Sequence, residues 1–466
     1  MARDRRRDNR ERIGACRRVL FGSVAAGIAA LWMGAACHAP MPNDPEVLRE
    51  YEGAYAWNAD AFVYLQLWPE LSGTDELVAF DESGKVRTLY LTSSDTFLTG
   101  RAAAVRTPVE ARATFHRDRS GRVVSMTWTR EGQPPRSARR ASTERHENVQ
   151  FRSGDVMLGG TLIAPAYEGK HPAVILVHGS GPQNRVSVLP LARFLIRRGV
   201  AVLGYDKRGV GESTGDWQTA SFDELAGDVL AAYEYLRSRP DVDAEHIGFL
   251  GISQAGWIMP MAAVRAEGLA FLISLSGPGV PGAETTIDHA RNEMSAGGLD
   301  PKTIDEIEAV MMLQYEFART GEGWEKYAAR RERLAARIGP PPSTFPAAPD
   351  DPHWEVIRRL YFYDPAPTLR RLQTPVLALF GELDNNVLPE KNLAAWREAM
   401  KTGGNRDYTL RIVPSANHIM MQGELGTNAE MPSLDGLVPC YFSIVSDWLR
   451  ERLKMFEARS GDVVKP

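Results

Sequence analysis

Gly251-Ile252-Ser253-Gln254-Ala255-Gly256 is a run of small residues around a serine, placed between a predicted strand and a predicted helix. The apolar run before it, residues 247–250, is typical of a buried strand, and residues 254–265 read as a helix. A serine at a sharp strand-to-helix turn is held in a strained backbone that exposes its hydroxyl, and small neighbours let strand and helix approach closely. The usual pattern is G-x-S-x-G, whereas here Ala255 holds the last position and Gly256 follows. Alone, this near-match is equally compatible with a structural turn that packs a strand on a helix.

Three further segments strengthen the pattern because they occur in a meaningful order. A glycine-rich turn, His178-Gly179-Ser180-Gly181-Pro182, follows an apolar strand and offers backbone N–H groups to a developing oxyanion. Asp384 and then His418 each come just past another apolar run that predicts a strand. Serine, acid and histidine in this chain order are the order of the α/β-hydrolases.

On these residues the chain resembles the α/β-hydrolase superfamily, and more closely the bacterial exported esterases and the serine aminopeptidase or acyl-peptidase-like hydrolases. The segments that carry the resemblance are 178–184, 205–213 and those around Ser253, Asp384 and His418. It spans residues 148–455, with an insertion. The resemblance implies an α/β fold with a mostly parallel sheet and a helical cap, and it specifies a catalytic type without specifying a substrate.

The resemblance also assigns roles to the candidate residues. A serine hydroxyl is a weak nucleophile that needs a base, and the base needs an orienting group. Ser253 is the expected nucleophile, His418 the general base and later acid, and Asp384 the carboxylate that fixes the imidazole tautomer. His418 is one of nine histidines, and other carboxylates compete with Asp384 for its role: Glu382, Asp206 and Asp228.

Backbone amides complete the expected site. The oxyanion hole should use the N–H of Gln254 and one N–H from the glycine-rich turn, that of Ser180, while His178 is expected to brace this turn. Residues 206–213 form a charged, glycine-rich turn that lacks the G-x-x-x-x-G-K-[ST] pattern, so a structural turn is favoured over a phosphate cradle. No dinucleotide fingerprint or metal-ligand spacing is present in the sequence, and we expect no cofactor and no metal.

The N-terminus predicts export. Residues 1–18 are rich in arginine and residues 19–36 are apolar and uncharged, which is typical of an export signal over residues 1–36, followed by a tether over 37–45. Cys37 resembles the lipidated cysteine of bacterial lipoproteins, although Gly34 stands where Leu is usual. Cleavage after Ala36 or Ala39 by the ordinary signal peptidase and a permanent transmembrane anchor are the alternatives. The expected location is exported, either periplasmic or as a membrane-anchored lipoprotein.

Composition excludes several other classes of protein. A chain of 466 residues predicts two or three folded units. The formal net charge is −4, and removal of residues 1–36 would take away eight arginines but only three acidic residues, so nucleic-acid binding is disfavoured. The three cysteines, Cys16, Cys37 and Cys440, exclude a disulfide scaffold. The membrane would be a partner only through the signal or a lipid at Cys37, and the oligomeric state stays open.

The pattern along the chain predicts a small antiparallel β-domain over 46–140, with a linker at 132–140, ahead of the catalytic domain over 148–455. The aromatic residues of the β-domain are expected to pack its core. In the catalytic domain, strands alternate with helices, including helices over 187–198 and 221–238, which implies a parallel sheet. This alternation stops between about 283 and 367, where a charged, helical segment predicts a cap over the active site.

We therefore expect a serine hydrolase that cleaves carboxylic esters of small molecules through an acyl-enzyme. A serine aminopeptidase or acyl-peptidase acting on small peptides is the first alternative, because the same triad serves both reactions. A peptidase needs acidic groups to hold a free amino terminus, and the cap supplies candidates that equally fit a solvated helix face: Glu306, Glu308, Glu316 and Glu322. A non-catalytic binding lipoprotein on a hydrolase scaffold is a further alternative, whereas a dehalogenase would normally place Asp at position 253.

Overall fold

The computed structural model describes residues 44–73, 76–339 and 344–453. The predictions for the export signal and for Cys37 lie outside these residues, as does nearly all of the predicted tether. Within the described ranges, no helix combines the length and the apolar character that crossing a bilayer requires.

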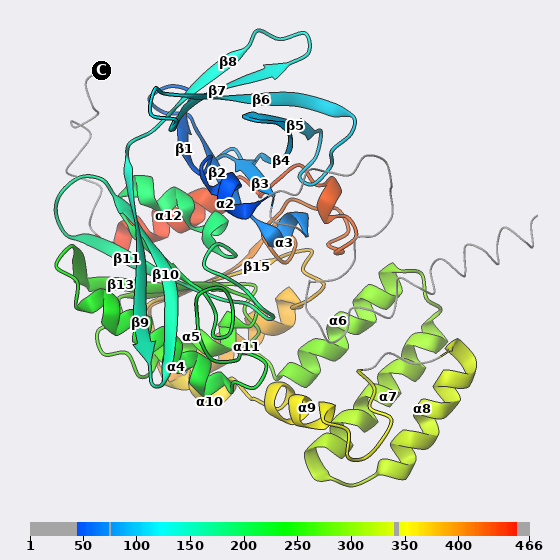
Figure 1. The fold of residues 1–466 in the computed structure, drawn as a ribbon. Coiled ribbons are helices and arrows are strands. Elements are labelled where there is room, and N and C mark those ends of the chain that lie inside the picture. The colour runs from blue at the N-terminus through cyan, green and yellow to red at the C-terminus, as the bar shows by residue number, and fades with distance from the viewer. Residues whose placement is uncertain (1–43, 74–75, 340–343, 454–466) are drawn as a thin grey trace, which may run out of the picture.

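The first part of the chain is a closed antiparallel barrel in which each strand pairs with the next and β8 returns to β1 (Figure 1). The strands are β1 (Gly53–Ala56), β2 (Phe62–Leu67), β3 (Leu77–Phe80), β4 (Val86–Ser93), β5 (Thr96–Gly100), β6 (Val109–Arg117), β7 (Val123–Arg130) and β8 (Arg136–Arg140). Short helices α2 (Pro45–Arg49) and α3 (Pro69–Ser72) accompany them. Four of the five aromatic residues expected to pack the core are buried, since Tyr51, Tyr55, Tyr64 and Trp68 are at most 2% exposed. The fifth, Trp57, is half-buried at the edge of the same core.

The predicted linker at 132–140 is wrong, because residues 136–140 form the strand that closes the barrel. Ala138 is the one buried residue of β8, and the residues on either side of it are exposed or half-buried. Arg136 lies over the ring of Trp57, and Arg140 donates to the carbonyl oxygen of Glu50 at 3.0 Å. The arginines gave this strand the composition of a solvated linker.

The second part is a single mixed sheet in the order β16-β15-β14-β13-β11-β12-β10-β9. The hairpin of β9 (Glu144–Ser153) and β10 (Val156–Pro165) leads into it by antiparallel pairing of β10 with β12. The remaining strands are mutually parallel: β11 (His171–Val177), β12 (Ala201–Tyr205), β13 (Val242–Ile252), β14 (Phe271–Leu275), β15 (Val376–Gly381) and β16 (Tyr408–Val413). Their carboxyl ends therefore meet at one edge of the sheet, where open α/β sheets place their sites.

Helices cover both faces of this sheet (Figure 1). One face packs α4 (Phe222–Arg237), α5 (Ala255–Ala263), α10 (Ala366–Arg371) and α11 (Pro389–Gly403). The other packs the 3₁₀ helices η1 (Leu189–Leu191) and η2 (Arg193–Arg198), α12 (Cys440–Leu453) and part of the barrel. α4 begins where the sequence predicts, because Ser221 and Glu224 form a reciprocal capping box.

The predicted helix over 187–198 is instead the pair of short 3₁₀ helices. Pro190 lacks the N–H that an α-helix needs, and Ala192 between the two pieces has a non-helical backbone, with φ −122°. The segment is apolar on nearly all sides because it is buried between the sheet and α12. Its composition therefore predicts burial correctly and the type of helix wrongly.

The insertion between β14 and β15 is helical, as the sequence predicts, and projects to one side of the sheet (Figure 1). It contains α6 (Gly282–Ala296), α7 (Pro301–Thr320), α8 (Trp324–Ile338) and α9 (His353–Tyr361), which share their own apolar core. We call α6 to α9 the cap.

Candidate active site

Ser253 occupies the turn between β13 and α5 in a left-handed backbone, with φ +58°. Its N–H donates to the carbonyl oxygen of Leu275 on β14 at 2.9 Å, and its own carbonyl oxygen accepts from Gly256 at 2.7 Å. A non-glycine residue in this conformation is strained and persists only where its surroundings hold it. The side chain is partly exposed, as expected for a serine presented at a sharp strand-to-helix turn.

Small residues make this turn possible and explain the departure from G-x-S-x-G. A Cβ added to Gly251 would lie 2.5 Å from the Cβ of Ala255, so Gly251 leaves the space that the extra methyl group fills. A Cβ on Gly256 would lie 2.4 Å from the Cα of Gly277, which follows β14. The residue that must stay small beside the next strand is therefore Gly256, and Ala255 is accommodated with no exposed surface.

Asp384 and His418 form a buried pair on the loops after β15 and β16. The Nδ1 atom of His418 lies 2.9 and 3.0 Å from the two carboxylate oxygens of Asp384. Asp384 Oδ1 also accepts from the N–H groups of Asn386 and Val387, both at 2.8 Å. These donors fix the carboxylate, and the carboxylate orients the imidazole so that Nε2 is left at the opposite end of the ring.

Ser253 lies at the same edge of the sheet as this pair, because β13, β15 and β16 are parallel and end there. Within the described ranges, no hydrogen bond joins the Ser253 hydroxyl to the imidazole of His418. Such contacts are often long until a substrate binds, so their absence does not exclude the pairing. The structure thus joins two of the three predicted catalytic side chains directly and brings the third to the same edge.

The glycine-rich turn after β11 lies against Ser253. A Cβ added to Gly179 would be 3.6 Å from the Cβ of Ser253. The N–H of Gly179 is already occupied, because it donates to Oε1 of Gln183 at 2.6 Å. By contrast, the N–H groups of Ser180 and Gln254 donate to no acceptor in the described part of the chain. These are the two amides that the sequence predicts for the oxyanion hole.

Lys207 contacts the glycine-rich turn from the end of β12. The sequence did not predict that Lys207 has a role at the site. Its ammonium donates to the carbonyl oxygens of Gly179 at 2.8 Å and Gly181 at 3.1 Å, and to the side chain of Gln254 at 3.3 Å. Burial lowers the pKa of Lys207 to about 7, while the charge of Asp228 opposes this shift. The one available signal was a lysine in a glycine-rich turn directly after a buried strand.

The neighbours of Lys207 are structural, as predicted for residues 206–213. Asp206 pairs with Arg185 at 2.6 Å, and Arg208 makes a bidentate contact with Asp228 at 2.7 and 2.8 Å. His178 contacts the backbone carbonyl oxygen at the end of β12 at 2.6 Å. Burial and the charge of Lys207 lower the pKa of His178 to about 3, so the ring is neutral and braces the turn.

The cap reaches the loop of the acid through α6. Nδ1 of His289 lies 3.4 Å from the carbonyl oxygen of Asn385, and the Asn292 amide donates to the same oxygen at 3.3 Å. Burial lowers the pKa of His289, and the charges of Glu293 and Asp384 act on it in the opposite direction. α6 is thus the part of the cap within electrostatic reach of the buried pair.

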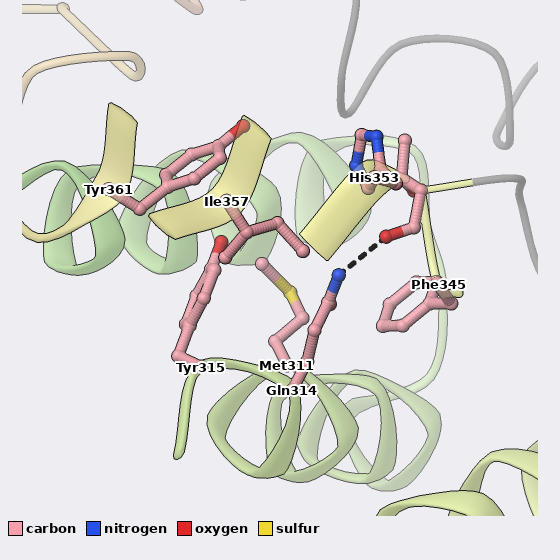
Figure 2. Close-up of a pocket in the computed structure, with 8 residues that line it drawn as sticks. Met311, Gln314, Tyr315, Phe345, His353, Ile357 and Tyr361 are labelled. Atoms are coloured by element: carbon pink, nitrogen blue, oxygen red, sulfur yellow. Dashed lines mark hydrogen bonds between the residues drawn. The ribbon is translucent and has the colours of Figure 1, made fainter. Parts of the chain in front are cut away.

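A small pocket inside the cap lies between α7 and α9 (Figure 2). Gln314 enters it from α7 and donates to the carbonyl oxygen of Thr344, while the rings of Tyr315 and Tyr361 pack at 5.5 Å. None of its lining residues belongs to the loops that carry Ser253, Asp384 or His418. The pocket is part of the packing of the cap itself.

Comparison with known proteins identifies the class of this chain. Residues 116–420, more than half of the sequence, match the X-Pro dipeptidyl-peptidase (S15) family. The chain belongs to this S15 family. It has the α/β-hydrolase fold, as the sequence predicts.

Individual relatives of this S15 protein include an esterase and a peptidase. Esterase EstD of Thermotoga maritima is 26% identical over 276 residues, covering 57% of this chain and 59% of that protein. Dipeptidyl-peptidase 5 of Porphyromonas gingivalis is 24% identical over 289 residues, covering 59% of this chain and 34% of that protein. The chain thus spans less than two thirds of the length of either relative.

Solved structures show a distant likeness. The Pyrococcus furiosus esterase Pf2001 has a TM-score of 0.43 and 18% identity, covering 66% of this chain and 91% of its own. The α/β hydrolase GrgF from a Penicillium species has the same TM-score and identity and is covered over 99% of its length.

Proposed function

We propose that this protein is a serine hydrolase that cleaves carboxylic esters through an acyl-enzyme, with Ser253, His418 and Asp384 as its catalytic residues. The observation that carries the proposal is the strained turn at Ser253, which lies beside two unoccupied backbone N–H groups at the same sheet edge as the buried Asp384–His418 pair. Nucleophile, base, orienting carboxylate and oxyanion donors are the parts that acyl transfer requires.

In the first step, Ser253 Oγ attacks the carbonyl carbon of the ester and His418 Nε2 accepts the hydroxyl proton. Asp384 holds the other ring nitrogen as Nδ1–H and stabilises the imidazolium that forms. The negative charge on the carbonyl oxygen is stabilised by the N–H groups of Ser180 and Gln254. As the tetrahedral intermediate collapses, His418 gives its proton to the leaving alcohol, and the acyl group stays on Ser253.

In the second step, water takes the place of the alcohol. His418 accepts a proton from the water, the resulting hydroxide attacks the acyl-enzyme, and the same two amides bind the oxyanion again. Collapse of this intermediate releases the carboxylic acid and returns the proton from His418 to Ser253 Oγ.

Two observations favour an ester over a peptide. One relative is named an esterase, and two of the four glutamates offered for holding a free amino terminus are engaged in ion pairs. Glu306 pairs with Arg337 at 2.7 Å, and Glu308 pairs with Arg291. Glu316 is exposed on α7, which fits a solvated face.

A second candidate function, cleavage of dipeptides or acyl-amino acids from peptides, is favoured by the family and by one carboxylate. Glu293 on α6 has a buried carboxylate oxygen, Oε1, with no hydrogen-bond partner in the described part of the chain. It lies close enough to His289 to act on its charge. A peptide ammonium group would satisfy such an oxygen, because charge-assisted hydrogen bonds compensate burial best.

The experiment is hydrolysis of short-chain p-nitrophenyl esters beside aminoacyl and Gly-Pro p-nitroanilides by the full chain, Ser253→Ala and Ser415→Ala. Ser415 is the matched control because it is also partly exposed and left-handed, with φ +57°. We expect ester turnover that disappears only in Ser253→Ala. A fluorophosphonate should label Ser253 and leave Ser415 unmodified.

Preferential turnover of the anilides would move the assignment to a peptidase. In that case Glu293→Gln should raise KM for the Gly-Pro anilide, and the exposed Glu316→Gln control should not. Equal activity of Ser253→Ala and the unaltered chain would refute the nucleophile.

A further inference from the structure

The β3–β4 hairpin at residues 81–85 makes one of the contacts between the barrel and the catalytic domain. In a neighbouring contact, the N–H groups of Ala103 and Ala104 donate to the carbonyl oxygens of Leu434 and Pro432 at 2.8 and 2.9 Å. The 81–85 turn lies against residues 434–437, which follow the 3₁₀ helix η3 (Met431–Ser433) and precede α12. The N–H of Leu437 donates to the carbonyl oxygen of Gly84 at 2.7 Å, and the N–H of Val86 donates to that of Asp435 at 3.1 Å. Lys85 and Gly436 form an antiparallel β-bridge between these bonds, so the hairpin and residues 434–437 pair as a short two-stranded ladder.

The same segment pairs on its other side with the loop that carries His418. The N–H of Gln422 donates to the carbonyl oxygen of Gly436 at 2.7 Å. Met421 and Leu437 form an antiparallel β-bridge. Met421 then contacts Asn417, whose backbone N–H donates to the Met421 carbonyl oxygen at 2.8 Å and whose side chain accepts from the Met421 N–H at 3.0 Å. A continuous series of hydrogen bonds therefore runs from the barrel to the residue beside His418.

An ion pair between a buried arginine and an exposed carboxylate adds to this contact. The side chain of Arg87 on β4 is 6% exposed and pairs with the carboxylate of Asp435. It also donates to the carbonyl oxygen of Asp435 at 2.9 Å and pairs with Glu110 of the barrel at 2.8 Å. Removing Arg87 would take away both the ion pair and the hydrogen bond that join β4 to Asp435.

The packing around the contact is continuous. Side chains of the barrel share one apolar core with the His418 loop and the segment that follows it: Phe80, Val86, Met420, Met421, Leu437 and Val438. The two parts are therefore joined as one packed unit at this point.

Glycine is required where the two backbones meet. Gly84 has φ +93°, and a Cβ there would lie 2.1 Å from the carbonyl oxygen of Leu437. Gly121, in the β6–β7 turn, provides an internal comparison. It ends the same Asp-x-Ser-Gly sequence, has φ +84°, and a Cβ there would meet nothing within 4 Å. The two turns are alike in sequence and backbone, and only one of them touches the catalytic domain.

We propose that the barrel is a positioning element of the active site, in which the 81–85 turn holds residues 434–437 and through them the loop of His418. This role rests on the proposed function of His418. In this role the β-domain affects the rate of the catalysed reaction by positioning the loop of His418, and it does not bind the substrate itself.

The test compares Gly84→Ala with Gly121→Ala in the full chain. Both changes place a methyl group in a left-handed turn, so both carry the same backbone strain. We expect Gly84→Ala to lower kcat for a short-chain p-nitrophenyl ester about 10²-fold with KM within about twofold, because small misplacement of a catalytic group costs this much. The rate of fluorophosphonate labelling at Ser253 should fall in parallel, and Gly121→Ala should match the unaltered chain in both.

A second pair of variants covers the case in which Gly84→Ala does not fold. Arg87→Met removes the ion pair to Asp435, while Arg117→Met removes a barrel ion pair to Asp95 that lies outside this contact. Only Arg87→Met should lower kcat. Equal kcat within either folded pair would overturn the positioning role, whereas an unaltered chain that neither hydrolyses the ester nor labels at Ser253 would overturn the proposed function instead.

Discussion

Replacing Lys207 by Met tests what holds the glycine-rich turn after β11 in place. The ammonium is 2% exposed and donates to two carbonyl oxygens of the turn, those of Gly179 and Gly181. Met has a similar length but neither charge nor donor. The change therefore removes the brace of the turn and, with it, a titrating group that burial has strongly perturbed.

The pKa of Lys207 determines the direction and the magnitude of the change in the free energy of unfolding with pH. Burial lowers the pKa of Lys207 from 10.5 to about 7 in the folded protein. Between these two values the unfolded chain binds a proton that the folded chain has lost, so the free energy of unfolding rises with pH. Between about pH 7 and pH 9 this single group should add about 2 kcal/mol, and below about pH 7 it should add no slope.

The assay is urea unfolding of the full chain and of Lys207→Met across this range. The variant should lack the rise, so the difference between the two free energies of unfolding should change by about 2 kcal/mol. Lys391→Met is the control, because ion pairs with Glu284 and Asp288 raise the pKa of Lys391, which places its slope at higher pH. Parallel curves for the full chain and Lys207→Met would refute the reasoning.

Activity gives an independent measure of the same change. Without its brace, the turn that carries the Ser180 N–H should move, and loss of one oxyanion donor typically costs about 10²–10³ in kcat. We expect a loss at the lower end for Lys207→Met, because the backbone amide itself remains. An unchanged kcat would show that the turn is held without Lys207.

Three further predictions concern Asp384 and the turn that carries Ser253. Asp384→Asn should lower kcat for a short-chain ester by about 10³–10⁴, because an amide favours the wrong imidazole tautomer, and a loss below tenfold would contradict the assigned acid. Gly256→Ala should lower the free energy of unfolding by about 1–3 kcal/mol, because its methyl group would overlap Gly277. Ala255→Gly should leave kcat nearly unchanged in the same assays, and a larger effect of Ala255→Gly would contradict the packing described for the turn.

The sequence predicted the catalytic domain well because its signals are local. Each candidate residue, Ser253, Asp384 and His418, directly follows an apolar strand, and parallel strands end at a common edge. The joining of Asp384 to His418 followed from that order. The start of helix α4 was equally predictable, because the residues of its capping box, Ser221 and Glu224, lie within four consecutive positions.

The features that the sequence did not predict depend on contacts between distant residues. Closure of the barrel requires Tyr55 on β1 to pair with Arg140 on β8. Nothing in the sequence around either residue indicates which distant residue it pairs with. Lys207 acquires its role only when β11 and β12 bring two turns together. The 3₁₀ pieces at 189–198 reflect burial against α12, which lies much later in the chain.

The contact between Arg87 and Asp435 also has a consequence for biosynthesis. It joins residues 348 positions apart, and a ribosome makes the N-terminal partner first. The 81–85 turn and β13 are both synthesised before the loop of His418. This loop and residues 434–437 can therefore pack against a barrel that is already present. A nascent or truncated chain that ends before residue 434 contains Ser253 but lacks the segment that contacts the loop of His418. On the proposed role of this segment, hydrolysis would begin only after synthesis has passed residue 437.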